Sequence, residues 1–119
     1  MGYVRVKGKV SNLMDKSKCA EIEFITDTGA MLTVVPALVL KNLGIGSRRK
    51  ERFKLATGEI RELPVGSAQI EIGGRERIID VVFGKEEAPA LLGVTTLETL
   101  GFEVDPVTGK LKSIEFMLL

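Results

Sequence analysis

Four consecutive residues, Asp27, Thr28, Gly29 and Ala30, are the part of this sequence best suited to chemistry. The apolar run that ends at Ile25 indicates a buried strand, so the acid follows that strand in a tight turn and faces a cleft. Glycine permits backbone angles or a close approach that a Cβ hinders, and the threonine hydroxyl can bond to nearby backbone and orient the carboxylate. An ordinary Asp/Thr/Gly loop after a strand has the same letters, so the tetrapeptide alone leaves both interpretations open.

Composition excludes several classes of enzyme. The 119 residues contain no histidine, which removes Ser-His-Asp catalysis, Cys-His catalysis and every zinc site that needs histidine. The single cysteine, Cys19, forms neither an intrachain disulfide nor a paired metal site. Carboxylate, lysine and hydroxyl chemistry remain, and we expect no metal and no organic cofactor.

Length and charge limit the architecture and the partners. A chain of this length with 45% hydrophobic residues supports one core, so we expect a single domain, residues 1–119. A formal net charge of +1 gives no electrostatic reason for a nucleic-acid partner, and we interpret the basic run 48–52 as a solvated loop. No apolar stretch is long enough to span a membrane, so we expect no membrane partner and a cytoplasmic location.

Alternation of apolar and polar residues predicts strands along most of the chain. It is clearest in four runs, namely 3–10, 20–25, 68–72 and 75–83. The pair Gly73-Gly74 joins the last two runs as a hairpin turn.

Two short helices and a terminal hairpin complete the expected elements. The first helix, 36–44, begins with proline and ends with glycine. The second, 95–101, has a hydroxyl cap candidate and an acid near its start, and a glycine at its end. Residues 102–116 predict a hairpin that turns at 106–109, and we expect the apolar tail 117–119 to pack, either within its own subunit or against a second one.

A further hairpin is predicted from Phe53 to Gly66, with two alternating arms around Thr57-Gly58. A hairpin over a cleft can bind an extended peptide as an added strand and exclude water from it. A plain surface hairpin of a β domain has the same pattern, so the sequence leaves its role open.

Taken in order, these segments resemble the retroviral-type (retropepsin-like) aspartic proteases from Phe24 to Gly101. In that family the Asp-Thr-Gly-Ala loop is followed by a strand, a β-hairpin flap, a second hairpin and an apolar-apolar-Gly motif that opens a short helix. The corresponding pieces here are 32–36, 52–66, the pair 68–72 and 77–83, and Leu91-Leu92-Gly93 before a helix at 94–100.

The resemblance implies a mainly β fold, a closed retropepsin-like barrel (the acid protease fold) with one or two short helices. It implies that Asp27 is catalytic and that Thr28, Gly29 and Ala30 support its loop. It assigns substrate binding to a flap with the tip residues Ala56, Thr57, Gly58 and Glu59. It places the motif Leu91, Leu92 and Gly93 beneath the site.

Such proteases use two carboxylates that share one proton, because like charges in contact cannot both ionise. This chain has one Asp-Thr-Gly, and its other aspartates do not repeat the pattern. The resemblance therefore implies a homodimer in which Asp27 of each chain meets the other on a two-fold axis. The expected activity is that of an aspartic endopeptidase acting on peptides or unfolded proteins.

Two positions depart from the retroviral pattern. Retroviral members commonly carry an aspartate after the alanine of the loop and an arginine after the glycine of the later motif, and these two form an ion pair. Met31 and Val94 stand at the matching positions here, so subunit contacts near the cleft are expected to differ. Two other interpretations stay open: a catalytically inactive retropepsin-like module for dimerisation or peptide binding, and a β domain with an accidental Asp-Thr-Gly.

Overall fold

A computed structural model describes residues 4–116 and 118 of the chain. In sequence order, the described part forms β1 (Arg5–Ser11), β2 (Cys19–Thr26), β3 (Thr33–Pro36), α1 (Ala37–Asn42), β4 (Arg49–Lys54), β5 (Ile60–Ile72), β6 (Arg75–Gly84), β7 (Ala90–Leu92), α2 (Val94–Leu100), β8 (Phe102–Val104) and β9 (Leu111–Ser113). The predicted strand at 3–10 corresponds to β1, and its first residue, Tyr3, lies outside the described residues.

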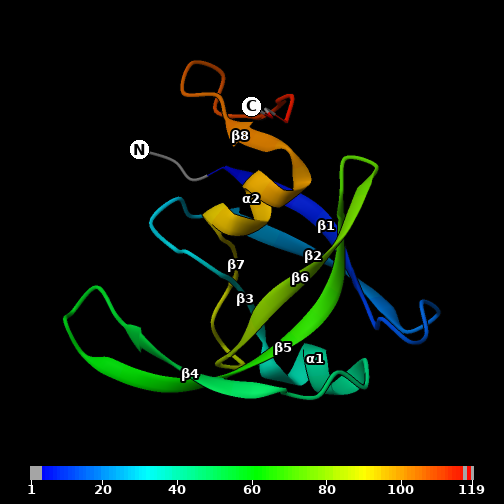
Figure 1. Cartoon of the computed structure of the whole chain (residues 1–119), viewed down its shortest axis with the longest axis vertical. Coiled ribbons are helices and arrows are strands. Elements are labelled where there is room, and N and C mark those ends of the chain that lie inside the picture. The colour runs from blue at the N-terminus through cyan, green and yellow to red at the C-terminus, as the bar shows by residue number, and fades with distance from the viewer. Residues whose placement is uncertain (1–3, 117, 119) are drawn as a thin grey trace.

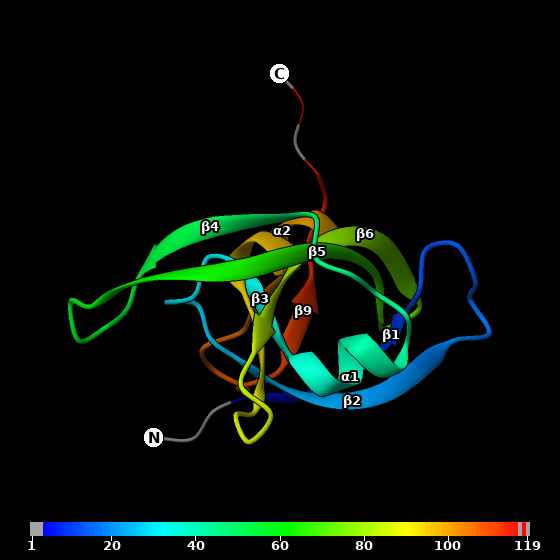
Figure 2. The same cartoon turned by 90° about the horizontal axis from the view of Figure 1, so that it is seen from below.

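Six strands close into a barrel. Their order is β1-β2-β7-β3-β6-β5, and pairing of β5 with β1 completes the ring. Strand β4 pairs with the outer part of β5 and extends away from the barrel, whereas β8 and β9 form a separate two-stranded hairpin (Figures 1 and 2). The predicted fold, a mainly β closed barrel with two short helices, is therefore confirmed.

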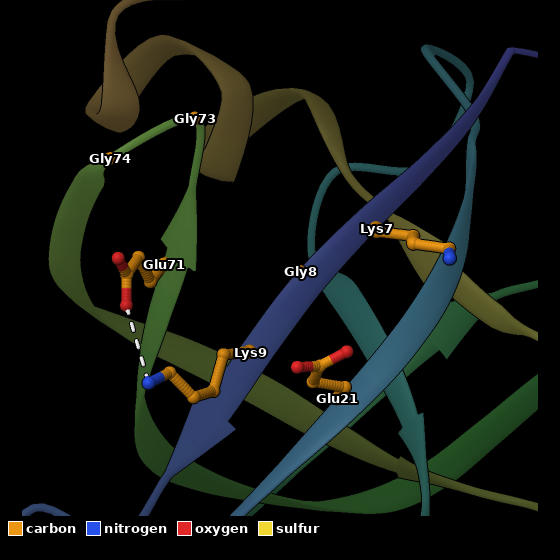
Figure 3. A pocket seen from close by; sticks show the side chains of 7 residues that line it. All are labelled: Lys7, Gly8, Lys9, Glu21, Glu71, Gly73 and Gly74. Atoms are coloured by element: carbon orange, nitrogen blue, oxygen red, sulfur yellow. Dashed lines mark ion pairs between the residues drawn. The ribbon is translucent and has the colours of Figure 1, made fainter.

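The barrel closes over a short seam. Strands β1 and β5 pair only from Lys9↔Glu71 to Ser11↔Gln69, and then diverge toward the Gly73-Gly74 turn. A pocket of about 290 Å³ lies at this point, lined by Lys7, Gly8, Lys9, Glu21, Glu71, Gly73 and Gly74 (Figure 3). An ion pair of 3.7 Å between Lys9 and Glu71 spans it. The pocket lies where the two strands diverge, and its lining residues do not include the Asp27 loop.

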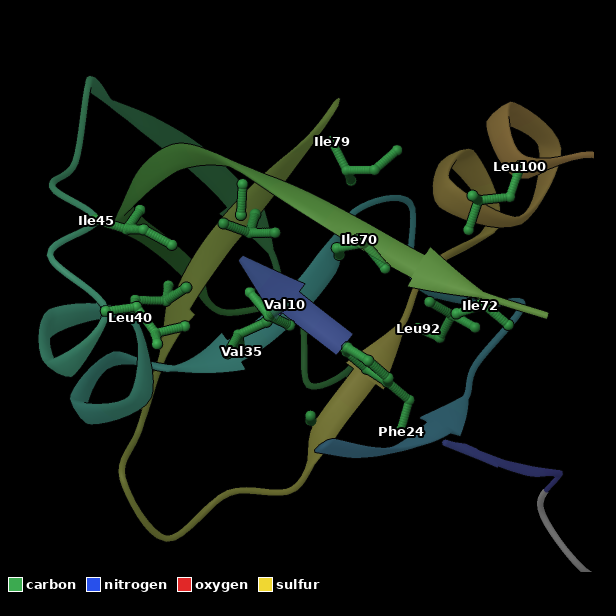
Figure 4. Packing of buried hydrophobic residues seen from close by; sticks show 14 of the residues in the cluster. Val10, Phe24, Val35, Leu40, Ile45, Ile70, Ile72, Ile79, Leu92 and Leu100 are labelled. Carbon is green, nitrogen blue, oxygen red and sulfur yellow. The ribbon is translucent and has the colours of Figure 1, made fainter. Parts of the chain in front are cut away.

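The core follows from the alternation seen in the sequence. On β1 and β2 the exposed positions other than Cys19 carry lysine, arginine and glutamate, whereas Val10 and Phe24 on the opposite face are 0% exposed. Residues from most of the strands and both helices meet inside the barrel (Figure 4). Each fully buried aliphatic or aromatic side chain contributes about 1.5–3 kcal/mol, so this core supplies the main stabilisation of the fold.

The two helices close the ends of the barrel. Helix α1 begins one residue later than expected, because Pro36 ends β3 and serves as the N-cap, and its Leu40 is fully buried. Helix α2 buries Leu97 and Leu100 and ends at Gly101, whose φ of 80° is left-handed. The predicted hydroxyl cap and early acid of α2 are wrong, because the N-cap is Gly93 without a side-chain cap hydrogen bond and the first turn holds no acid.

The hairpin predicted over 53–66 forms the tip of a longer one. Strand β5 has thirteen residues and continues past Gly66; its first part pairs with β4 and its last eight residues pair with β6. The prediction that the basic run 48–52 is a loop is wrong, because residues 49–52 belong to the exposed strand β4. Arg49 of this strand donates to Asp80 of β6 at 3.1 Å, and the carboxylates of Glu51 and Asp80 raise the pKa of Arg49.

The terminal hairpin turns where the sequence predicts. Asp105 accepts hydrogen bonds from the backbone N–H groups of Val107 at 2.8 Å and Thr108 at 3.4 Å, and the first of these chiefly lowers the pKa of its carboxyl group.

Most of the predicted apolar tail, Met117 and Leu119, lies outside the described residues, whereas Leu118 is 96% exposed in the single chain. In the described part of the chain, neither helix has the length and apolar character needed to cross a membrane.

Candidate active site

Asp27 stands directly after β2, at the start of the turn that leads to β3. Its backbone N–H donates to the Leu92 carbonyl at 3.0 Å, and the preceding residue, Thr26, donates to the Val4 carbonyl at 2.8 Å. The residue itself is half-buried and the following two are exposed. The carboxylate of Asp27 therefore lies at the surface, while hydrogen bonds to Leu92 and Val4 fix the backbone of Asp27 and Thr26.

The carboxylate is oriented by Gly29. The Gly29 N–H donates to Asp27 Oδ1 at 2.9 Å, and the Ala30 N–H donates to the Asp27 carbonyl at 3.0 Å. The hydrogen bond to the carboxylate seen in the described part comes from Gly29, and a role of the Thr28 hydroxyl in orienting the acid stays a prediction. Gly29 has no positive φ; a Cβ there would lie 3.2 Å from Asp27 Oδ1, so close approach to the carboxylate favours glycine.

Helix α2 holds the other end of the turn. Its first N–H groups have no partner within the helix, and two of them donate to the turn instead: Val94 to the Ala30 carbonyl at 2.8 Å and Thr95 to the Met31 carbonyl at 3.1 Å. A Cβ at Gly93 would lie 2.5 Å from the Leu32 carbonyl carbon, a distance that real atoms do not reach. The glycine of the Leu91-Leu92-Gly93 motif is therefore required because two backbones touch.

Two buried threonines join these segments. Thr33, at the start of β3, and Thr96, in α2, are each 0% exposed, and their hydroxyl oxygens are 2.6 Å apart. The Gly93 N–H donates to Thr33 Oγ1 at 3.0 Å. Sequence reasoning missed this pair; the available signal was a threonine at the start of the apolar run 33–36, where a buried hydroxyl needs a partner.

Of the four aspartates in the sequence, Asp27 is the one that lies in this turn. Asp80 pairs with Arg49 on the far side of β6, Asp105 lies in the terminal turn, and Asp15 accepts from the hydroxyl and N–H of Ser17, which lower its pKa. Among residues 4–116 and 118, no group of three His, Cys, Asp or Glu side chains is arranged to hold a metal ion.

A groove lies beneath the flap hairpin. Its volume is about 570 Å³, and its lining residues are Val34, Leu55, Thr57, Glu59, Arg61, Leu63, Val82, Phe83, Gly84 and Lys85. Of the predicted flap residues, Thr57 and Glu59 line it, and Glu59 pairs with Arg61 at 3.0 Å. Ala56, Gly58 and Asp27 are not among its lining residues. The flap tip and the turn after β2 nevertheless project on the same side of the molecule (Figures 1 and 2).

The site thus consists of a strand followed by Asp-Thr-Gly and of an apolar-apolar-Gly motif that braces this turn. Comparison of the sequence with protein families agrees with this arrangement. Residues 18–99 match the family described as gag-polyprotein putative aspartyl protease. The chain belongs to this family. It is thus a retropepsin-like protein, and the match spans every element from the end of the first loop to α2.

Solved structures support the same fold. The chain is similar to the simian foamy virus (mac) protease in solution, with 17% identity, a TM-score of 0.59, and 81% of this chain and 93% of that one covered. The EIAV protease complexed with the inhibitor HBY-793 shares 18% identity at a TM-score of 0.62, with 84% of this chain and 89% of that one covered. A retropepsin-like aspartic protease from Rickettsia conorii shares 22% identity at a TM-score of 0.60, with 87% of this chain and 77% of that one covered. The comparison with curated proteins finds no match.

Proposed function

We propose that this retropepsin-like chain is an aspartic endopeptidase that works as a homodimer. Residues 1–119 act as one domain, and Asp27 of each chain contributes one carboxylate to a shared dyad. The observation that carries the proposal is the turn at Asp27, where Gly29 orients a carboxylate at the surface, while the other three aspartates, Asp15, Asp80 and Asp105, have partners elsewhere in the chain. A dyad built from this turn needs a second copy.

The proposed reaction uses two carboxylates and one proton between them. The ionised Asp27 takes a proton from a water molecule while the water oxygen attacks the carbonyl carbon of the peptide bond. The protonated Asp27 of the other chain donates to the carbonyl oxygen. As the C–N bond of the resulting tetrahedral intermediate breaks, the first Asp27 gives the proton it took from water to the departing amine. The Asp27 of the other chain takes a proton from a hydroxyl of the intermediate, which leaves a carboxyl product and restores the dyad.

The groove supports an extended peptide as substrate. Its floor is aliphatic and aromatic, from Val34, Val82 and Phe83, and its cover is the flap hairpin. An extended chain placed there would meet flap backbone on one side and apolar side chains on the other. The flap residues Ala56 to Glu59 would contribute backbone groups, and the Leu91-Leu92-Gly93 motif would hold the Asp27 turn from below.

Substitution of the acid tests the proposal. In the purified protein Asp27→Asn should lower cleavage of an unfolded substrate by about 10²- to 10⁴-fold, because both carboxylates of the dyad, the general base and the general acid, are replaced. Circular dichroism and the sedimentation coefficient should stay unchanged. Asp15→Asn, at an exposed turn aspartate outside the site, is the matched control and should cleave normally. Cleavage at the wild-type rate by Asp27→Asn would reject the assignment.

Protein concentration tests the homodimer. Activity per chain should rise with concentration and level off when the dimer predominates, and a peptide-mimetic inhibitor of aspartic proteases should abolish it. A wild-type protein that binds this inhibitor but never cleaves would instead indicate a catalytically inactive binding module.

Cytoplasmic location and the lack of nucleic-acid and membrane partners stay predictions.

A further inference from the structure

One peptide unit connects the Asp27 turn to the buried threonine pair. The Leu92 carbonyl accepts from the Asp27 N–H at 3.0 Å, and the next N–H along the chain, that of Gly93, donates to Thr33 Oγ1 at 3.0 Å. These two groups belong to the same planar unit and cannot rotate independently. A rotation that breaks one hydrogen bond therefore displaces the other.

The site leaves this peptide unit few alternatives. Leu92, Thr33 and Thr96 are each 0% exposed, and Gly93 is buried against the backbone of Leu32. Water cannot readily replace a lost partner at such a place, and a buried N–H without an acceptor is costly. Loss of the Thr33 hydroxyl would thus favour rotation of the peptide unit toward another acceptor.

We propose that Thr33 is a positioning residue for the reaction: its hydroxyl, held by Thr96, fixes the Leu92–Gly93 peptide unit and through it the backbone of Asp27. This inference rests on the proposed function for its kinetic consequence, although the structural consequence does not require catalysis. The effect is on geometry, and misplacement of a catalytic group by about 1 Å can lower a rate by about 100-fold.

The chain offers a matched control. Thr99 also lies in α2, and its hydroxyl donates to the Thr95 carbonyl at 2.7 Å on the exposed side of the helix. Thr99→Val removes a hydroxyl of the same type from the same helix without touching the Leu92–Gly93 unit. Thr33→Ser keeps the hydroxyl and should restore function, whereas Thr33→Val keeps the shape and removes the acceptor.

The kinetic experiment compares kcat and KM for these variants at a protein concentration that keeps them dimeric. Thr33→Val should lower kcat by about 10- to 100-fold with KM changed by less than about 2-fold. Thr96→Val should have a smaller effect in the same direction, and Thr33→Ser and Thr99→Val should stay close to wild type. A kcat loss in Thr33→Val no larger than that in Thr99→Val would overturn the proposal.

Amide hydrogen exchange supplies a readout that does not need an active enzyme. The Asp27 and Gly93 amides should exchange faster in Thr33→Val, relative to the amides of β6, but not in Thr99→Val. If the wild type cleaves nothing and these amides still respond, the proposed function fails while the positioning contact stands. If Thr33→Val is too unstable to study, the exchange rates of the same two amides are compared between Thr96→Val and Thr33→Ser. An unchanged rate at the Asp27 amide in Thr96→Val would contradict the positioning role.

Discussion

The Asp27 turn, residues 27–31, and the flap tip, residues 55–59, have the same length and project on the same side of the molecule, but different partners hold them. Asp27, Ala30 and Met31 bond to β7 and α2, which lie far away in sequence. The flap tip is closed by its own bonds, from Leu55 N–H to Glu59 O and from Gly58 N–H to Leu55 O, each 2.8 Å.

This difference separates two requirements of a protease of the proposed kind. A catalytic acid must stay where the reaction needs it, so its backbone is best fixed by the whole fold. A cover must admit substrate and release products, so it is best held by few and local contacts. The residues at the tip are all exposed or half-buried, as a mobile cover requires.

The largest effect is expected at Gly93, which braces the Asp27 turn. Gly93→Ala should lower the free energy of unfolding by about 3 kcal/mol or more, because the new Cβ would overlap the backbone of Leu32. Urea denaturation followed by circular dichroism measures this. Gly46→Ala is the matched control, because nothing lies within 4 Å of its Cβ position, and a similar loss in that variant would show that backbone contact at Gly93 is not the cause.

A smaller effect is expected at the flap tip. Gly58 has a φ of 89° and open space around it, so Gly58→Ala should cost about 1 kcal/mol of local backbone strain. On the proposal that this hairpin is a flap held mainly by local contacts, the variant should raise KM for peptides and speed exchange of amides 55–59, with little change in the melting temperature. Gly74→Ala places similar strain, at a φ of 80°, in a barrel hairpin and should lower the melting temperature instead. Equal effects of the two substitutions would contradict a mobile flap.

The smallest effect is expected where the flap base meets the barrel. The Arg49–Asp80 ion pair is the side-chain link between β4 and β6, but both side chains are more than 40% exposed. Solvent and salt screen such pairs, so Asp80→Asn should leave the melting temperature unchanged within error at physiological salt. A clear loss of stability, abolished by added salt, would mean that the flap base is anchored more firmly than its exposure indicates.

Local sequence was sufficient for most of the fold. Alternation of apolar and polar residues predicted β1, β2, β5 and β6, because one face of each strand packs against the core and the other faces water. The pair Gly73-Gly74 predicted a turn, and the φ values there are 58° and 80°. Boundaries were less accurate where tertiary contacts overrode local signals. Strand β5 continues through Gly66 because it pairs with β6 there. The basic run forms the edge strand β4 because it pairs with β5.

The site was only partly accessible from sequence. Asp27 and Gly93 stood out, because an acid after a buried strand and a glycine after an apolar pair are visible in the letters. The Thr33–Thr96 contact joins residues 63 positions apart, and no local pattern links them. The cap of α2 was mispredicted for the same reason, since its N–H groups bond to the Asp27 turn and need no side chain of their own.

Strand β5 joins the flap to the barrel without a loop between them, since its thirteen residues run from the flap tip to the seam with β1. On the β5 side the predicted flap therefore has no loop that could serve as a hinge, so a movement of the flap would require bending and twisting of a continuous strand, whereas on the β4 side residues 43–48 form an irregular connection to α1. If the hairpin serves as the proposed flap, the stiffness of β5 near Val65 and Gly66, where pairing changes from β4 to β6, would limit how far the flap opens.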